Sequence, residues 1–194
     1  MSESHNPSDK ELLERIRNKD EGAFRLLIER YESQVAATVL GMLGNRADAE
    51  DIGQEIFIRF YKSIEQFRGE SSLGTYLTRI AINLSLNELK RRERKNRRFL
   101  FIGDHEEKEQ LFQSGETDEL EQKELRELIQ EAINKLKPEF KAVVILRMIQ
   151  DYSTNETAEI LNIPIGTVLS RYSRAIDKLK ILLTPYIKNH EINL

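Results

Sequence analysis

Apolar residues recur along most of this chain at the three- and four-residue steps that place side chains on one face of an α-helix. Two stripes are the clearest: Ile52, Ile56, Phe60 and Ile64 in one segment, and Leu73, Leu77, Ile80 and Leu84 in the next. The two-residue alternation of a strand is scarce, and the 194 residues include only four prolines and nine glycines. The pattern predicts an all-α protein.

Capping signals mark several of the expected helix starts. Ser8 with Glu11, and Ser153 with Glu156, have the spacing of a capping box, in which each side chain bonds the other residue's backbone N–H. Other caps and breaks are expected at Asp20 and Asn45, which begin helices, and at Gly41 and Gly44, which interrupt them.

The helical pattern fails between residues 99 and 122, and charge changes sign there. Residues 87–98 hold seven basic side chains against two acidic ones, whereas residues 103–127 hold ten acidic against three basic. An acidic stretch without an apolar stripe is typical of a linker. We therefore predict a helical domain over 8–98, an acidic linker over 99–122 and a second helical domain over 123–188, with the two domains loosely joined.

The second domain has the spacing of a helix–turn–helix. Ala158 is small where two helices would cross, Asn162 tolerates the left-handed conformation that the turn needs, and Pro164 suits the first turn of the next helix. The outer stripe of that helix would be Thr167, Ser170 and Arg174, side chains that can approach phosphates and base edges. A plain helical hairpin with a solvated face is the alternative.

Two further surfaces stand out in the first domain. Asp48, Asp51 and Glu55 fall at i, i+3, i+7 beside Gln54, a pattern open to three interpretations: a metal cluster, a solvated face or a docking surface. Further on, side chains that can hydrogen-bond an unpaired base or its phosphates recur at four-residue steps: Arg79, Asn83, Asn87 and Arg91. Nearby Tyr76 and Phe67 could stack on bases or fill the core; for Phe67 the core is preferred.

Composition excludes several classes of function. The chain has no cysteine and three scattered histidines, so we expect no disulfide, no metal site and no cofactor. The first ten residues are polar and the longest plainly apolar run covers only residues 142–146, so neither a signal peptide nor a membrane span is expected. The prediction is a soluble cytoplasmic protein.

Five motifs in order resemble the extracytoplasmic-function (ECF) subfamily of bacterial sigma-70-type sigma factors. They are DEGAF at 20–24, AEDIGQEIF at 49–57, FRGESS at 67–72, TYLTRIAIN at 75–83 and IPIGTVLSR at 163–171. The resemblance spans nearly the whole chain. It implies a protein that makes no bond itself, but binds core RNA polymerase and directs it to promoters.

The resemblance also implies roles for particular residues. The first domain would be sigma region 2 and the second sigma region 4. The implied core-polymerase-binding residues are Asp48, Asp51, Gln54, Glu55 and Arg59. The implied −10 DNA-binding residues are Phe67, Ser71, Ser72, Thr75, Tyr76, Arg79, Asn83, Asn87 and Arg91. The implied −35 DNA-binding residues are Thr167, Leu169, Ser170, Arg171, Ser173 and Arg174.

Further implications concern partners and place. An anti-sigma factor is the implied regulator, and the protein would work at the nucleoid or be held at the inner membrane by that regulator. The net charge is −3, and the two DNA-binding domains are expected to be loosely linked. The free protein should therefore bind DNA poorly. A stand-alone helix–turn–helix repressor is the alternative, although the chain shows no dimer or ligand signature.

Three departures from the family pattern fall at single positions, and a fourth precedes the turn, where residues 155–158 read NETA in place of the usual Glu-Glu-Ile-Ala. Tyr76 stands where the family usually has tryptophan, Asn87 where it has aspartate, and Leu169 where it has a basic residue. The loss of a cation at Leu169, on the recognition helix, predicts an unusual −35 preference.

Overall fold

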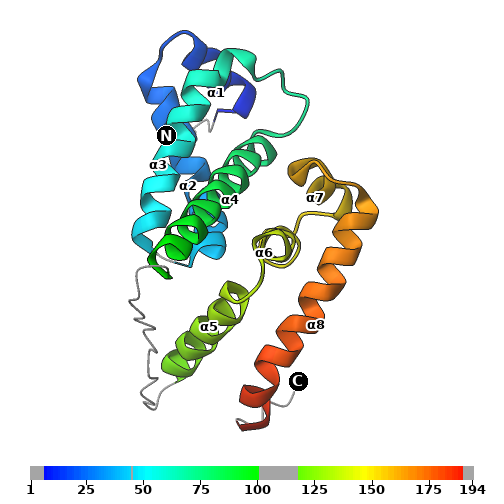
Figure 1. Ribbon diagram of the computed structural model, residues 1–194. Coiled ribbons are helices and arrows are strands. Elements are labelled where there is room, and N and C mark those ends of the chain that lie inside the picture. The colour runs from blue at the N-terminus through cyan, green and yellow to red at the C-terminus, as the bar shows by residue number, and fades with distance from the viewer. Residues whose placement is uncertain (1–6, 45, 101–117, 190–194) are drawn as a thin grey trace.

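The computed structural model describes residues 7–44, 46–100 and 118–189, and all regular structure in these ranges is helical (Figure 1). The N-terminal half contains α1 (Asp9–Arg17), α2 (Glu21–Leu43), α3 (Arg46–Ser63), the 3₁₀ turn η1 (Ile64–Gln66) and α4 (Leu73–Leu100). The C-terminal half contains α5 (Asp118–Asn134), α6 (Pro138–Val144), the π-helical turn η2 (Ile145–Ile149), α7 (Thr154–Leu161) and α8 (Ile165–Asn189). The prediction of an all-α fold is confirmed.

In the N-terminal half, α2 packs against α1, α3 and α4. Both predicted apolar stripes line this core, where Ile56, Phe60 and Leu77 are almost completely buried. Burial of such side chains is the main stabilising term of a helical bundle. The core thereby fixes the outer faces of α3 and α4, which carry most of the N-terminal candidate residues.

The local signals in the sequence agree with most of the helix ends. Both capping boxes form: Ser8 accepts from the Glu11 backbone, and Ser153 accepts from that of Glu156. The prediction that Gly41 interrupts a helix is wrong, because α2 runs through it and ends at Gly44, whose φ is 67°. Glycine suits this left-handed C-terminal position because it has no Cβ. Asn45 lies outside the described residues.

The C-terminal half contains the predicted helix–turn–helix. Asn162 ends α7 in the left-handed conformation, with φ 51°. Pro164 lies one residue before α8, and its carbonyl accepts the first bonds of that helix from Thr167 and Val168. A small core of Val143, Ala158 and Val168 holds the motif together. The recognition helix also buries Ala175 and Leu179 in the main apolar core.

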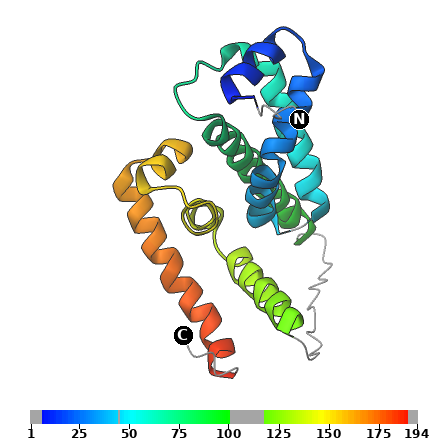
Figure 2. The same cartoon turned by 180° about the vertical axis from the view of Figure 1, so that it is seen from behind.

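The two halves are not loosely joined, and that prediction is wrong. In both views, α6 lies between α4 and α8, and α7 lies beside α4 (Figures 1 and 2). Ile145 and Leu146 are fully buried in one continuous apolar core that also contains side chains of α2 and α4. The sequence shows two sets of helical stripes but not that their faces fit each other.

The predicted linker is narrower than expected at both ends. α4 continues to Leu100 and α5 begins at Asp118, so helix extends into the 99–122 segment from each side. Residues 101–117 lie outside the described ranges. No helix among the described residues is long and apolar enough to cross a membrane.

Candidate functional site

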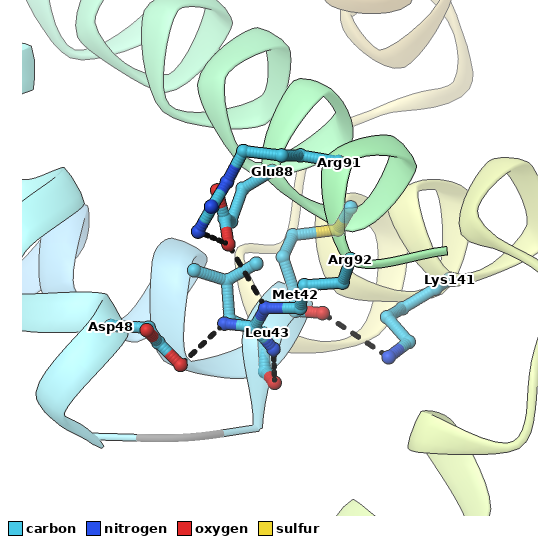
Figure 3. Close-up of polar contacts among 7 residues, drawn as sticks. All are labelled: Met42, Leu43, Asp48, Glu88, Arg91, Arg92 and Lys141. Carbon is cyan, nitrogen blue, oxygen red and sulfur yellow. Dashed lines mark hydrogen bonds and ion pairs between the residues drawn. The ribbon is translucent and has the colours of Figure 1, made fainter. Parts of the chain in front are cut away.

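Three of the five candidate docking residues are exposed to solvent on the outer face of α3. Asp51, Gln54 and Arg59 are exposed, and Arg59 Nε donates to Glu55 Oε1 at 2.7 Å. Asp48 differs, because its carboxylate pairs with Arg92 of α4 at 2.6 Å (Figure 3). Asp48 therefore ties α3 to α4 in addition to any part in docking.

A groove beside this face was missed by the sequence reasoning. It runs between α2 and α3, has a volume of about 650 Å³, and includes Gln54 in its lining. Leu40 and Ile58 line it, yet 40% and 46% of their surfaces remain exposed. Large apolar side chains left open beside a polar rim are typical of a protein-binding surface. These two residues fall outside the regular core stripes, which is the signal that could have revealed the groove.

The acidic pattern on α3 does not gather into a metal site. Among the described residues, no three or more histidine, aspartate or glutamate side chains come close enough to hold a metal ion. Asp48 and Glu55 instead face arginines, and Asp51 stands exposed. The docking interpretation of the stripe fits this arrangement better than the metal interpretation.

The predicted stripe lies on one face of α4. Its residues differ in exposure and in whether they already have a hydrogen-bond partner. Asn83 and Asn87 are exposed, with amides that can both donate and accept. Arg91 is exposed but forms a two-bond pair with Glu88, at 2.7 and 2.8 Å (Figure 3). The Arg91 guanidinium holds the pKa of Glu88 below its ordinary value, with Arg92 acting in the same direction. Arg91 must leave this carboxylate before it can fully engage a phosphate.

The loop before α4 is anchored by aromatic packing. Phe67 is 7% exposed, and its ring lies 4.9 Å from that of Tyr76 and 6.4 Å from that of Phe60. Arg17 Nη2 donates to the Phe67 carbonyl at 2.7 Å. Phe67 is therefore a core residue, as preferred from the sequence, and Tyr76 is only partly open.

The polar residues of the loop lie at the start of α4. The Ser72 side chain accepts from the Thr75 backbone N–H at 3.1 Å, and the two hydroxyls are 2.8 Å apart. Ser72 is exposed, Ser71 half-buried and Thr75 buried. Ser72 acts as an N-terminal cap, so its hydroxyl fixes where the loop ends and the helix begins.

On the first half of α8, the candidate residues form a polar face turned to solvent. Ser170, Ser173 and Arg174 are exposed, while Thr167 and Arg171 are half-buried. Leu169 stands on this face with 54% of its surface exposed, which nothing in its own packing requires. The face is therefore largely open to solvent.

Comparison with protein-family models matches both halves. Residues 27–95 match Sigma-70 region 2, and residues 126–179 match Sigma-70 region 4. The chain is 34% identical to the ECF RNA polymerase sigma-E factor of Haemophilus influenzae over 183 residues, which cover 92% of this chain and 96% of the relative. The chain belongs to the ECF subfamily of the sigma-70 factors. A second relative, the RNA polymerase sigma-H factor of Pseudomonas aeruginosa, is 30% identical over 93% of this chain and 96% of its own length.

Solved structures of sigma factors share the fold. The sigma factor RpoE of Bartonella quintana, solved in complex with the anti-sigma factor NepR, superposes with a TM-score of 0.65 at 22% identity over 83% of this chain and 96% of that one. CnrH, solved with the cytosolic domain of CnrY, gives the same TM-score at 21% identity over 92% of this chain and 99% of its own.

Family membership decides the class of function. The protein is a sigma factor, a DNA-binding factor of transcription initiation that partners core RNA polymerase at promoters, and not an enzyme. The repressor alternative is not favoured, because a match to both sigma regions in order would not be expected of it.

Proposed function

We propose that the α3 face and the adjoining groove dock on core RNA polymerase. Asp51 and Gln54 supply exposed polar contacts, and the open side chains of Leu40 and Ile58 supply apolar area beside them. A protein interface typically combines an apolar centre with a polar rim, which is the combination that this surface offers. The juxtaposition of Gln54 with the groove is the observation that carries the proposal.

The α4 face would hold unpaired −10 DNA. Asn83 and Asn87 would hydrogen-bond an unstacked base, and Arg79 and Arg91 would contact the backbone. The Nε of Arg79 is buried and has no hydrogen-bond partner among the described residues, so this side chain is incompletely satisfied without a ligand. Phe67 would act indirectly, by fixing the loop of Ser71 and Ser72 that borders the base.

The first half of α8 would read duplex −35 DNA in the major groove. Arg174 and Arg171 can bond guanine or phosphate, while Thr167, Ser170 and Ser173 approach closely. Leu169 replaces a charged contact with an apolar one that suits a thymine methyl group. The domains in this scheme are residues 8–98 and 123–188, joined by the acidic segment 99–122.

We infer that the protein acts in the cytoplasm, on polymerase at the nucleoid. An anti-sigma factor would hold it in reserve, at the inner membrane where that factor is membrane-bound. Support comes from the two structural neighbours above, which were solved with an anti-sigma factor and with a cytosolic partner domain. The exposed groove between α2 and α3 is a surface that such a regulator and polymerase would compete for.

The test of docking is co-elution with bacterial core polymerase, followed by run-off transcription on a genomic library. The double variant Asp51→Ala, Gln54→Ala should lose most of its affinity for core polymerase. The matched control Glu14→Ala removes an exposed carboxylate of α1, remote in sequence from the α3 face, and should bind as the wild type does. Normal core binding by the double variant would refute the assignment of the α3 face. Duplex binding without polymerase would restore the repressor alternative.

A further inference from the structure

The carbonyl end of the α3–η1 segment is capped by a side chain from α1. Helix α3 continues into η1, which ends at Gln66, with Phe67 as its C-terminal cap residue. The last carbonyls of a helix have no partner within it, and a cation is favourable beside them. Arg17 Nη2 donates to the Ile64 carbonyl at 3.3 Å and to the Phe67 carbonyl at 2.7 Å. One guanidinium therefore bonds both the end of η1 and the start of the loop that leads to α4.

Helix α1 is itself anchored, and Arg17 is its last residue. Its apolar face is buried in the main core, where Ile16 is 2% exposed. At its start, Asp9 accepts from Arg30 Nη1 at 2.6 Å and from the Tyr31 hydroxyl at 2.5 Å, and both of these partners lie on α2. The place of Arg17 is therefore set by the fold of the N-terminal half, and not by the loop that it holds.

The loop between η1 and α4 is fixed at its two ends. At the first end Arg17 holds the Phe67 carbonyl, and at the second the Ser72 hydroxyl caps α4. Among the described residues, no hydrogen bond or ion pair involves residues 68–71, which lie between these ends. Gly69 has a φ of 74°, and a Cβ built on it would meet nothing within 4 Å. The path of the loop is therefore set by its anchors rather than by contacts of its own.

Phe67 connects this anchor to the α4 face. Its carbonyl accepts from Arg17, and its buried ring lies 4.9 Å from the ring of Tyr76 on α4. On its other side, the Phe67 ring lies 6.4 Å from that of Phe60. In a close-packed cluster, a shift of one ring displaces its neighbours or leaves a gap. Loss of the Arg17 bonds would therefore affect the loop backbone and, through the Phe67 ring, also Tyr76.

We propose that Arg17 is a positioning residue for −10 recognition: by holding the Ile64 and Phe67 carbonyls, it sets the path of the loop that borders the unpaired base. The inference rests on the proposed −10 role of this loop and of α4. The sequence pattern gives no sign of this role, because the groups that Arg17 bonds are backbone carbonyls, the farther of them 50 positions away.

Three variants test the proposal. Arg17→Met removes the guanidinium and keeps a long side chain, and Arg17→Lys keeps the positive charge. Arg15→Met is the matched control, because Arg15 is an exposed arginine of the same helix that pairs with Asp20 at 2.9 Å and not with the loop. Each variant is combined with core polymerase, and transcription is measured on a promoter selected from the genomic library and on single-base variants of its −10 and −35 elements. The affinity for core polymerase is measured in parallel.

We expect Arg17→Met to lower the discrimination between preferred and other −10 bases by about fivefold, the factor that the loss of one base contact brings. Its discrimination among −35 bases and its affinity for core polymerase should match those of the wild type. Arg17→Lys should recover part of the loss, and Arg15→Met should show none. Unchanged −10 discrimination in Arg17→Met would overturn the proposal, as would an equal loss of all three properties, which marks a general weakening of the fold. A wild type that does not discriminate among −10 bases would instead refute the proposed function of the α4 face.

A spin label on the loop reports on its anchoring without polymerase. The chain has no cysteine, so Glu70→Cys, at an exposed position, takes a single nitroxide label. With Arg17→Met added, the electron paramagnetic resonance spectrum of the free protein should show a more mobile label, with helix content by circular dichroism unchanged. Arg15→Met added to the same labelled protein should leave the spectrum as it was. A label that is no more mobile in Arg17→Met would contradict the claim that Arg17 holds the loop.

Discussion

The two halves of the molecule support their candidate DNA-binding faces differently. The face on α4 is backed by a large core containing Phe60 and Leu77, and Arg91 is already paired with Glu88. The face on α8 is backed by Val168 in a small separate core and by Ala175 and Leu179 in the main core, which this helix shares with the N-terminal half. The N-terminal face is partly self-neutralised and rests mainly on the core of its own half, whereas the C-terminal face is more open and rests partly on the opposite half.

This difference fits the different DNA-binding roles proposed for the two faces. In the proposed scheme the α4 face would hold a base out of its stack, and the packing beneath that face would help to offset an unstacking cost of a few kcal/mol. A helix that enters the major groove needs free side chains and the ability to move to its site. The following predictions test this contrast, from the largest expected effect to the smallest.

Phe60→Ala should have the largest effect on stability. Phe60 is fully buried beside the rings of Phe67 and Tyr76, so its truncation leaves a cavity beneath the −10 loop. We expect a loss of about 3–5 kcal/mol in the free energy of unfolding. Urea denaturation followed by circular dichroism measures it. A loss under 1 kcal/mol would show that Phe60 contributes less to the N-terminal core than its burial implies.

Arg174→Ala should weaken −35 recognition by about 1–3 kcal/mol and relax the preference at one base pair. The matched variant on the other face, Arg91→Ala, should weaken DNA binding without changing sequence preference. Its effect should be smaller, because the Arg91 guanidinium is already paired with the Glu88 carboxylate. Binding of polymerase holoenzyme to a library of promoter variants measures both. Equal effects of the two variants would remove the distinction between the faces.

Raising the pH should favour the packed state through Lys141. The pKa of this ammonium is about 8 when it is buried between the packed halves and near its ordinary 10.5 when the halves are apart, so packing releases a proton between these values. Below pH 8 packing carries the full cost of burying the charge, and that cost declines as the pH rises toward 10.5. Charged neighbours around the site are Arg92, Glu93, Lys137 and Glu139.

Scattering at pH 7 and pH 9.5 should show the packed fraction rising, by roughly thirtyfold in the equilibrium constant. Lys141→Met keeps the length of the side chain and removes the titrating group, so its packing should not change over the same range. A response to pH that persists in Lys141→Met would assign the effect to another group.

The two capping boxes provide a matched pair of smaller changes. Ser153→Ala and Ser8→Ala each remove a side-chain acceptor at a helix start and should each cost about 1 kcal/mol of stability. Only Ser153→Ala should also weaken −35 binding, because α7 supports the recognition helix. Thermal melts and duplex binding separate the two effects. Weaker −35 binding by Ser8→Ala would show that the halves communicate more than their separate roles imply.

Leu169→Arg should have the smallest effect. An added cation on the exposed face of α8 should strengthen −35 binding a few-fold and steepen its salt dependence by about one counterion. A titration of holoenzyme binding at several salt concentrations measures the slope. An unchanged slope would mean that residue 169 points away from the phosphates.

Sequence reasoning predicted helices over most of the described residues, both capping boxes and the turn of the helix–turn–helix. These features depend on residues close together in the chain, such as Ser153 with Glu156 and the left-handed Asn162. It misassigned Gly41, because a glycine that permits close packing looks the same in a sequence as one that ends a helix. It also left Asp48 among the docking residues without its partner Arg92, which lies 44 positions away.

The sequence by itself determined the helices, their apolar faces, the order of the motifs and hence the family, because helix propensity, capping and periodicity are local. Only the tertiary structure decided that the halves pack together, that Gln130 and Lys141 cap α2, and that an apolar groove lies open beside Gln54. These features join residues far apart in the chain, and their free energy comes from shape and charge complementarity between surfaces. No pattern along a single helix encodes that complementarity.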